Sequence, residues 1–407
     1  MFFLMACSPA ALEVVGEEEE RGKSGNNPDT AAPVEEIEEA PDQPPVDDWI
    51  FSLEQVHEVA LTLSPGGMES LRADPRTFVQ ADLQIDGREV KGIGVRIKGR
   101  LGSLRSIDQK AGLKLDFNTL GGTDELSGLH ALNLNNMVQD CSWVHERIAY
   151  GIYRGMGIPA PRVGYARVTV DGQLFGLYSV VEEYDKTFLK KWYEDPSGNL
   201  YDGDYKLWPD GHYTLLDFDS SVQQWFDLDS GTDVGLADIS AVTTALDSAR
   251  TEQVEEKVGP VVDLDHFARL WAVDAWVGHY DSYSYNINNY RVYFDPSDGR
   301  ADLFPWDPDW AFYESTPVST PSGRLARACK EDSECHERFL QALEATTAWV
   351  GQSDLQEQLR TASELIEPYI SGDPRRETDP ATIQSCQTQL KAWLRLRGDR
   401  LGDMSGL

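Results

Sequence analysis

The chain has 407 residues, of which 41% are hydrophobic and 10% aromatic, so it is long enough to bury a sizeable core in one large or two ordinary domains. It carries 36 Lys and Arg against 69 Asp and Glu, a formal net charge of −33 at pH 7. Such a chain lacks the basic footprint that nucleic-acid binding needs, and it disfavours binding to anionic lipid surfaces. The charge is compatible with basic protein substrates or with solubility alone.

The first 48 residues predict an export signal followed by a tether. Met1 to Cys7 is an apolar run that ends in Leu-Met-Ala-Cys, which is typical of a bacterial lipoprotein signal. The run is short and has no positively charged start, so we expect the true start to lie upstream. Residues 8–48 are acidic and of low complexity, with too few apolar groups to offset the entropy of ordering. We expect a disordered tether here, with membrane contact only through a lipid anchor at Cys7.

Residues 79–182 predict a set of strands. Apolar and polar residues alternate over 79–98, which predicts a β-hairpin, and residues 111–117 and 130–136 predict two further strands. A second hairpin is predicted around the Asp171-Gly172 turn.

The rest of the chain predicts mainly helices. One amphipathic helix precedes the second hairpin, and the others follow it: residues 142–156, 186–193, 238–256, 336–370 and 380–402. Residues 201–225 are rich in Asp, Tyr and Trp, and we expect them to form an insert near a cleft.

Residues 263–312 hold polar groups in a pattern that suits phosphoryl transfer. A helix capped by Asp263 ends at His279-Tyr280-Asp281, and Asn286 follows five residues later. A predicted hairpin then leads to Asp307 and Asp309. One carboxylate can orient an acceptor hydroxyl, while an amide and a second carboxylate can hold Mg²⁺ on phosphates. The same residue types also close ordinary turns.

Five segments, in this order along the chain, share motifs with one family. They are Arg96-Ile-Lys98-Gly99 with Ser103 and Lys110; Asp140-Cys-Ser142 with Glu146; Gly155 to Arg162; Asp171-Gly172 to Glu182; and Asp281-Ser-Tyr, Asn289-Tyr-Arg-Val-Tyr and Pro305-Trp306-Asp307-x-Asp309. Together they resemble the CotH kinase family, the spore coat protein H-like atypical protein kinases. Ser282 stands where that family often has Gly, and the run before Asn289 does not align, so either Asn286 or Asn289 is the metal-binding amide.

The resemblance implies an α+β, two-lobed atypical protein-kinase-like fold over residues 49–407. Its N-lobe would be an antiparallel sheet over about residues 75–185, and its helical C-lobe would span about residues 186–407. It also implies transfer of the ATP γ-phosphoryl group, with Mg²⁺ or Mn²⁺, to a Ser or Thr hydroxyl of an exported or cell-envelope protein.

The resemblance also implies roles for individual residues. Asp281 would orient or deprotonate the hydroxyl. Asp307, with Asn286 or Asn289 and with help from Asp309, would bind the metal. Lys110 or Lys114 would hold the phosphates, with Lys110 as the better match, and Glu146 would fix that lysine. The remaining nucleotide contacts would come from Lys98, Ser103 and Glu182.

Four cysteines follow Cys7, and an even count in an exported protein indicates disulfides. The spacing of Cys329 and Cys335 suits a short loop closure, which leaves Cys141 with Cys386 by elimination. A structural zinc site is the rival interpretation, although His336 beside two Cys is a poor ligand set.

Two other functions fit the same residues. One is a non-catalytic surface adhesin or scaffold on the same fold. The other is a surface protein in which Ca²⁺ stabilises the Asp and Asn cluster.

Overall fold

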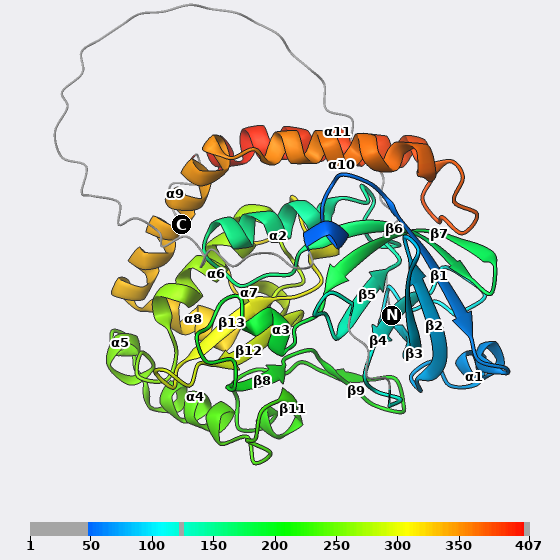
Figure 1. Cartoon of the computed structure of the whole chain (residues 1–407). Coiled ribbons are helices and arrows are strands. Elements are labelled where there is room, and N and C mark those ends of the chain that lie inside the picture. Colours follow the sequence, from blue (N-terminus) through cyan, green and yellow to red (C-terminus); the bar gives the residue numbers. More distant parts are fainter. Residues whose placement is uncertain (1–47, 122–125, 403–407) are drawn as a thin grey trace, which may run out of the picture. The chain divides into compact units, whose positions relative to one another are not determined.

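The structure is a computed structural model that describes residues 48–121 and 126–402 (Figure 1). The predicted signal at Cys7 and the predicted tether, apart from its last residue, lie outside this range. Within it the chain is α+β, with a barrel of strands, a second small sheet and a set of helices.

Seven strands close into a barrel. Apolar side chains alternate along them and fill the interior, which explains why these segments pair. Neighbouring strands are antiparallel except at the closing pair, where β1 runs parallel to β6 with Val59 opposite Val168. In barrel order the strands are β1 (His57–Leu63), β2 (Val79–Ile85), β3 (Arg88–Lys98), β4 (Gly112–Asp116), β5 (Ala131–Asn135), β7 (Gln173–Glu182) and β6 (Val163–Val170).

The antiparallel sheet that we expected in the N-lobe is present, and one parallel pair closes it into a barrel. The sequence interpretation missed β1, although its apolar residues alternate as a half-buried strand requires. Since β1 supplies the parallel pair with β6, its omission hid the closure of the sheet.

A second, four-stranded sheet lies in the C-terminal half. It has the order β11 (Asp227–Ser230), β8 (Asn199–Asp202), β12 (Tyr290–Phe294) and β13 (Ala301–Pro305). A two-stranded ribbon, β9 (Lys206–Leu207) with β10 (Tyr213–Thr214), follows β8. The predicted hairpin after Asn289 is therefore the β12–β13 pair, and the insert expected at residues 201–225 supplies β8, β9 and β10 with the turn η2 (Gln223–Trp225).

The largest hydrophobic core is built around α6 (Leu264–Val277), which is buried on nearly all sides. Asp263 caps this helix as predicted, because its side chain accepts a hydrogen bond from the His266 N–H at 2.9 Å. The other helices are α1 (Gly67–Ala73), α2 (His145–Gly155), α3 (Lys186–Leu189), α4 (Ala237–Ser248), α5 (Val254–Lys257), α7 (Tyr283–Asn286), α8 (Arg324–Glu331), α9 (Ser333–Gln352), α10 (Leu355–Ile370) and α11 (Pro380–Gly402). Two short 3₁₀ turns complete the list, η1 (Asp48–Ile50) and η3 (Pro308–Trp310).

Two predicted helices differ from the structure in length. The single helix expected over residues 238–256 is split into α4 and α5, because the chain leaves the helix at Ala249 in an extended conformation. The helix expected over residues 186–193 is one short turn, α3.

The connection between α10 and α11 is fastened to the barrel. The buried Asp373 carboxylate accepts hydrogen bonds from Lys110 Nζ at 2.6 Å and from the Leu177 N–H at 2.9 Å. A disulfide joins Cys141, just before α2, to Cys386 in α11, and a second joins Cys329 to Cys335. Both predicted pairings are confirmed. Among the described helices, none has the length and apolar character needed to cross a membrane.

Candidate active site

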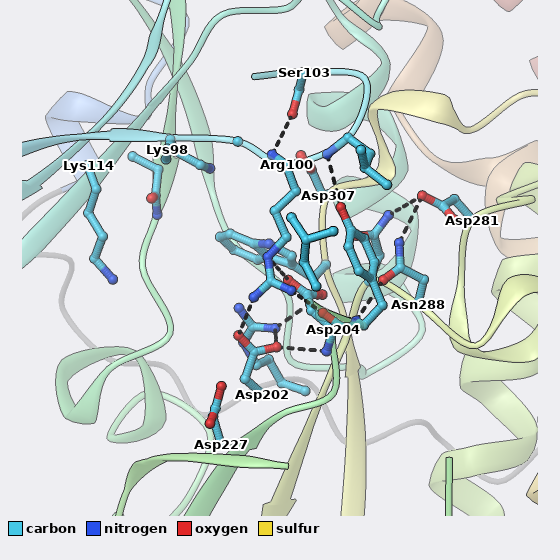
Figure 2. Close-up of a pocket in the computed structure, with 18 of the residues that line it drawn as sticks. Lys98, Arg100, Ser103, Lys114, Asp202, Asp204, Asp227, Asp281, Asn288 and Asp307 are labelled. Carbon is cyan, nitrogen blue, oxygen red and sulfur yellow. Dashed lines mark hydrogen bonds and ion pairs between the residues drawn. The ribbon is translucent and has the colours of Figure 1, made fainter. Parts of the chain in front are cut away.

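A cavity of about 530 Å³ lies where β3 and β4 of the barrel face β8, β12 and the β13–η3 connection (Figure 2). Its lining is strongly charged with both signs. The cations are Arg76, Arg96, Lys98, Arg100, Lys114, Lys206 and Arg291, and the carboxylates are Glu183, Asp202, Asp204, Asp227, Asp281, Asp307 and Asp309. Cations and carboxylates are equal in number, so the lining offers partners both for the phosphates of a nucleotide and for a metal ion.

Among the lysines that line the cavity, Lys98 has the surroundings most like those of the lysine that holds the ATP phosphates in kinases. It ends β3, and its ammonium group donates a hydrogen bond to Asn135 Oδ1 on β5. Asn135 in turn donates to Glu146 Oε1 at 2.6 Å, and Ser179 Oγ donates to the other Glu146 oxygen at 2.8 Å. Glu146 thus holds the lysine through an amide rather than through a direct ion pair.

The Lys98–Asn135–Glu146 relay is largely shielded from solvent and has the Asp307 carboxylate beside it. Burial lowers the pKa of Lys98, while the charges of Asp307 and Glu146 act in the opposite direction. Burial and the neighbouring Asp307 raise the pKa of Glu146 to about 8. A cation bound beside Asp307 and Glu146 would therefore favour the ionised form of these carboxylates.

Asp307 and Asp309 project from the turn that follows β13. Asp307 has a φ of 46°, in the left-handed region that Asp tolerates better than most residues, and its N–H donates to the Tyr150 hydroxyl at 2.9 Å. The Asp309 carbonyl contacts the His145 ring at 3.2 Å, so both anchors come from α2, the helix of Glu146. This turn and the Glu146 helix are therefore fixed to each other.

Neither the Asp307 nor the Asp309 carboxylate accepts a hydrogen bond from any other residue within the described range. Burial raises the pKa of both, and the charge of Asp307 adds to the effect on Asp309. Two half-buried carboxylates without donors are poised to bind a cation.

Asp281 is held by three amides. Its Oδ1 accepts from Asn286 at 2.5 Å, and its Oδ2 accepts from Asn289 at 2.9 Å and from Asn288 at 3.1 Å. These donors favour the ionised carboxylate, but burial outweighs them and raises the pKa of Asp281 to about 6. Near neutral pH Asp281 is mostly an oriented carboxylate, as a group that accepts a proton from a hydroxyl must be.

The loop that carries Asp281 rests on a buried polar network. α6 ends at Gly278 with a φ of 60°, and the chain turns there toward Asp281. His279 is fully buried, and burial lowers its pKa to about 3, so it is neutral. Asp274 on α6 accepts hydrogen bonds from Tyr153 at 2.5 Å and from Ser284 at 2.6 Å, which joins this loop to α2.

Seven of the eleven predicted site residues line the cavity, and four do not. Lys98, Ser103, Lys114, Asp281, Asn289, Asp307 and Asp309 line it, and Glu146 lies in the adjoining small cavity with Lys98. Lys110, expected to hold phosphates, does not line the cavity and is buried in an ion pair with Asp373, whereas Lys98 lines it. Glu182 is buried against Arg162 at 2.7 Å and Lys191 at 2.6 Å and does not line the cavity. Glu183 lines it instead and binds Lys114 at 2.7 Å.

The positions of Asn286 and Asn289 relative to the cavity bear on which of them could bind a metal ion. Asn286 supports Asp281 and is not part of the cavity lining, whereas Asn289 lines the cavity. The Oδ1 of Asn289 accepts no hydrogen bond from another described residue, so it remains available to a ligand.

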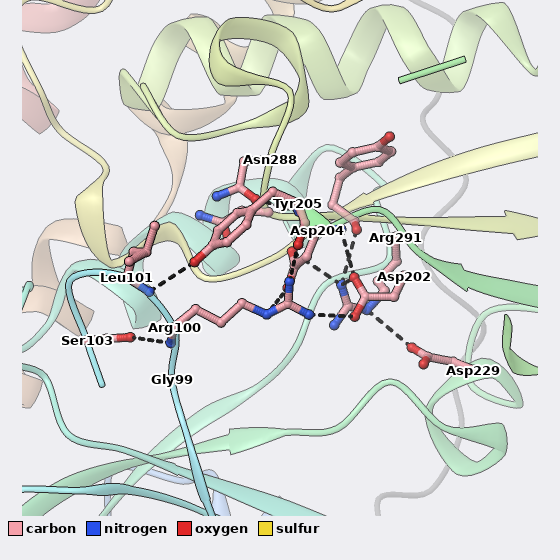
Figure 3. Close-up of polar contacts among 12 residues, drawn as sticks. Gly99, Arg100, Leu101, Ser103, Asp202, Asp204, Tyr205, Asp229, Asn288 and Arg291 are labelled. Carbon is pink, nitrogen blue, oxygen red and sulfur yellow. Dashed lines mark hydrogen bonds and ion pairs between the residues drawn. The ribbon is translucent and has the colours of Figure 1, made fainter. Parts of the chain in front are cut away.

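The sequence interpretation missed a group of cavity residues on the loop after β3 and around β8. Arg291 on β12 binds Asp202 at 2.7 Å and lies 3.6 Å from Asp204, and Arg100 lies 3.9 Å from each of these carboxylates (Figure 3). Burial and the charge of Asp202 raise the pKa of Asp204 to about 7. The richness of residues 201–225 in Asp and aromatic residues was the only signal for this side of the cavity.

The donor set fits Mg²⁺ as kinases bind it. Among the described residues no group of three or more His, Cys, Asp or Glu side chains could hold a metal unaided. Mg²⁺ needs fewer protein ligands than that, since it usually takes one or two carboxylates and completes its shell with water and substrate phosphates. Asp307, Asp309 and the Asn289 amide oxygen supply oxygen ligands of that kind.

The cavity lies between a sheet-rich part and a helical part of the chain. It brings together a half-buried lysine, a glutamate on a neighbouring helix, an oriented aspartate and paired carboxylates, and this combination defines a kinase-like protein. Residues 95–401 match the family described as CotH kinase protein, and the chain belongs to that family. The predicted α+β, two-lobed kinase-like fold is confirmed.

Two relatives are similar to part of the chain. The "Inner spore coat protein H" of Bacillus subtilis is 21% identical over 273 residues, which cover 62% of this chain and 72% of that protein. The "Invasin CotH2" of Rhizopus delemar is 22% identical over 270 residues, which cover 56% of this chain and 42% of that protein. The chain thus spans less than half the length of this second relative.

Solved kinase structures are more distant. The Helicobacter pylori proinflammatory kinase CtkA superposes with a TM-score of 0.28 at 11% identity, covering 72% of this chain and 95% of that one. A Golgi casein kinase gives a TM-score of 0.27 at 8% identity, covering 87% of this chain and 74% of that one. At these scores the superpositions carry no weight, and the fold rests on the family match and on the elements described above.

Proposed function

We propose that the protein is an active kinase that transfers the γ-phosphoryl group of ATP to a Ser or Thr hydroxyl of an exported or cell-envelope protein. The observation that carries this proposal is the convergence of Lys98, Asp281 and Asp307 on one cavity although they come from distant parts of the chain. The family match and the two disulfides support it, since disulfides persist in oxidising compartments.

Each group has a role that follows from its surroundings. Lys98, held by Asn135 and Glu146, binds phosphate oxygens of the nucleotide. Asp307 and Asp309, with Asn289, hold a divalent cation, Mg²⁺ or Mn²⁺. Such an ion supplies neutralisation of the charge on the phosphates.

Asp281 acts on the acceptor. Its carboxylate is fixed by three amides, so it can orient an acceptor hydroxyl with little loss of entropy on binding. In the transfer the hydroxyl oxygen forms a bond to the γ-phosphorus and its proton passes to Asp281. The bond from the γ-phosphorus to the β-γ bridging oxygen breaks, and ADP leaves with the bonding electron pair.

The test is phosphoryl transfer from labelled ATP by the purified full-length protein to a panel of generic Ser- and Thr-containing acceptor proteins. We expect label in acid-stable phosphoserine or phosphothreonine, dependent on Mg²⁺ or Mn²⁺, and its loss in Asp281→Asn. Asp82→Asn is a matched control, because Asp82 is a barrel carboxylate away from the cavity. No transfer to any acceptor, together with unimpaired nucleotide binding, would contradict the proposal.

A non-catalytic surface binding protein on the same fold is the second candidate, and the description of one relative as an invasin favours it. Under that function nucleotide and metal binding would be absent or would leave ATP intact. A melting temperature raised by Ca²⁺ alone, with no further gain from nucleotide, would instead indicate a Ca²⁺-stabilised surface protein.

A further inference from the structure

The loop that joins β3 to β4 bends over the cavity directly after Lys98. Gly99 has a φ of 104°, which a residue with a side chain rarely adopts, and its carbonyl accepts a hydrogen bond from Arg76. The Arg100 N–H donates to Ser103 Oγ at 3.4 Å, and the Leu101 N–H donates to the Tyr205 hydroxyl at 2.9 Å. The loop is thus fastened across the cavity to the segment that follows β8 (Figure 3).

The Arg100 side chain enters the cavity and makes few hydrogen bonds there. Its guanidinium donates one hydrogen bond to a described residue, at the Tyr205 carbonyl, and packs 5.2 Å from the Tyr205 ring centre. The two carboxylates nearest to it, Asp202 and Asp204, are each 3.9 Å away, which is beyond hydrogen-bonding distance. A guanidinium has five N–H donors, so most of the capacity of Arg100 is open to a ligand in the cavity.

Asp202 and Asp204, the carboxylates beside Arg100, have Arg291 as a second cationic partner. Asp202 is bound by Arg291 at 2.7 Å, and it also accepts a hydrogen bond from the Asp204 N–H at 2.8 Å. Arg291 also lies 3.6 Å from Asp204. When Arg100 turns toward an anion, Arg291 remains beside both carboxylates.

A chain of hydrogen bonds places Arg100 at the acceptor end of the cavity. Arg100 donates to the Tyr205 carbonyl, the Tyr205 N–H donates to Asn288 Oδ1 at 3.4 Å, and Asn288 donates to Asp281 at 3.1 Å. Figure 2 shows the Arg100 side chain between Lys98 and Asp281. Lys98, Arg100 and Asp281 line one cavity, so a chain of phosphates held by Lys98 can extend toward Arg100.

We propose that Arg100 binds the terminal phosphate of a nucleoside triphosphate and so distinguishes it from the di- and monophosphate. This inference rests on the proposed function, and it adds a residue to which neither the motifs nor the family resemblance assigned a role. The planar, permanently charged guanidinium matches the oxygens of a phosphate. On binding, the guanidinium gives up its hydrogen bond to the Tyr205 carbonyl and donates to the phosphate oxygens instead.

The test compares the affinities of the full-length protein for a non-hydrolysable ATP analogue, ADP and AMP, each with Mg²⁺, by isothermal titration calorimetry. We expect Arg100→Ala to weaken the triphosphate analogue about 10- to 100-fold, because hydrogen bonds to charged groups are the strong ones. We expect ADP and AMP affinities to change less than about threefold, and Arg100→Lys to recover part of the loss.

Arg105→Ala is the matched control, since Arg105 belongs to the same loop but pairs outside the cavity with Glu377 at 2.6 Å. It should leave all three affinities unchanged. Melting temperatures without ligand show that each variant is folded.

Equal weakening of all three nucleotides by Arg100→Ala would assign the residue to loop structure and overturn the inference, as would unchanged affinity for the triphosphate. Absence of nucleotide binding to the wild-type protein would overturn the inference and the proposed function together. Selective triphosphate binding without phosphoryl transfer would contradict the proposed kinase activity and leave the role of Arg100 intact.

Discussion

The two lysines that bracket the β3–β4 loop have opposite surroundings. Lys110 is fully buried and makes a one-to-one ion pair with Asp373 at 2.6 Å, on the side where the α10–α11 connection is fastened to the barrel. Lys98 is half-buried and hydrogen-bonds a neutral amide beside several carboxylates. We call these the anchor side and the site side of the loop.

The comparison separates a lysine whose charge is paired inside the protein from one that lines a cavity. At the anchor side the charges of Lys110 and Asp373 compensate each other, so neither group is left to bind a ligand. At the site side the Asp307 and Asp309 carboxylates accept no hydrogen bond from another described residue, so they are left to bind a ligand. Such uncompensated groups cost stability and are retained where they do chemistry. Four predictions test this contrast.

The largest expected effect is on the site side. Asp281→Asn should lower kcat/KM about 10²- to 10⁴-fold, the range associated with loss of a positioned proton acceptor. Nucleotide affinity should change little, because in the proposed function Asp281 contacts the acceptor hydroxyl and not the nucleotide. Steady-state kinetics and calorimetry on the same preparation measure both quantities, and a variant with kcat/KM close to wild type would remove Asp281 from the mechanism.

The two lysines should respond in opposite ways to the same substitution. Lys110→Met leaves Asp373 buried without its countercharge and should lower the free energy of unfolding by about 3–5 kcal/mol. Lys98→Met should lower kcat/KM about 10²- to 10³-fold through the loss of charge stabilisation, with a stability change below about 1 kcal/mol. Denaturant unfolding and kinetics on both variants check this. Loss of activity without loss of stability in Lys110→Met would reverse our assignment.

The anchor side also depends on the Cys141–Cys386 disulfide. This bond closes a loop of 245 residues, whereas Cys329–Cys335 closes one of 6. In the chain-entropy account the longer loop stabilises more, so Cys141→Ala with Cys386→Ala should cost about 2–4 kcal/mol and Cys329→Ala with Cys335→Ala less. Thermal unfolding of the two double variants shows which disulfide contributes more to stability. A larger loss for the Cys329–Cys335 pair would argue against a stabilising attachment of α11 through Cys386.

The smallest effect concerns pH. Burial raises the pKa of Asp281 to about 6, and the group must be ionised to accept a proton. Activity should therefore rise with pH, reach half its maximum near pH 6 and level off above about pH 7. A profile of kcat/KM against pH for the free enzyme reports this value, and an acid limb near pH 4 would show that the pKa of Asp281 is not raised.

The sequence predicted much of the fold because hairpins and amphipathic helices are local patterns. The β2–β3, β6–β7 and β12–β13 hairpins, α2 and the capped α6 follow from alternation, turn residues and helical spacing. It did not predict the closed barrel, since closure depends on the pairing of β1 with β6 over a long separation.

The same distinction holds for the site. Asp281 and Asp307 were found from motifs, and their meeting in one cavity follows from the helix and hairpin between them. The burial of Lys110 outside the cavity was not predicted, because its partner Asp373 lies 263 residues away and no local pattern indicates the pairing. Arg100 and the carboxylates after β8 lie in loops without periodicity, where spacing gives no information about position.

The most direct test of the central claim is calorimetric binding of a non-hydrolysable ATP analogue with Mg²⁺ to the full-length protein and to Asp307→Ala. The account predicts binding that requires nucleotide and metal together and that is lost or weakened about 10²-fold or more in the variant, as expected when a charge-neutralising group is removed. Equal binding to both proteins, or no binding by wild type at any metal concentration, would contradict a nucleotide-metal site at Asp307.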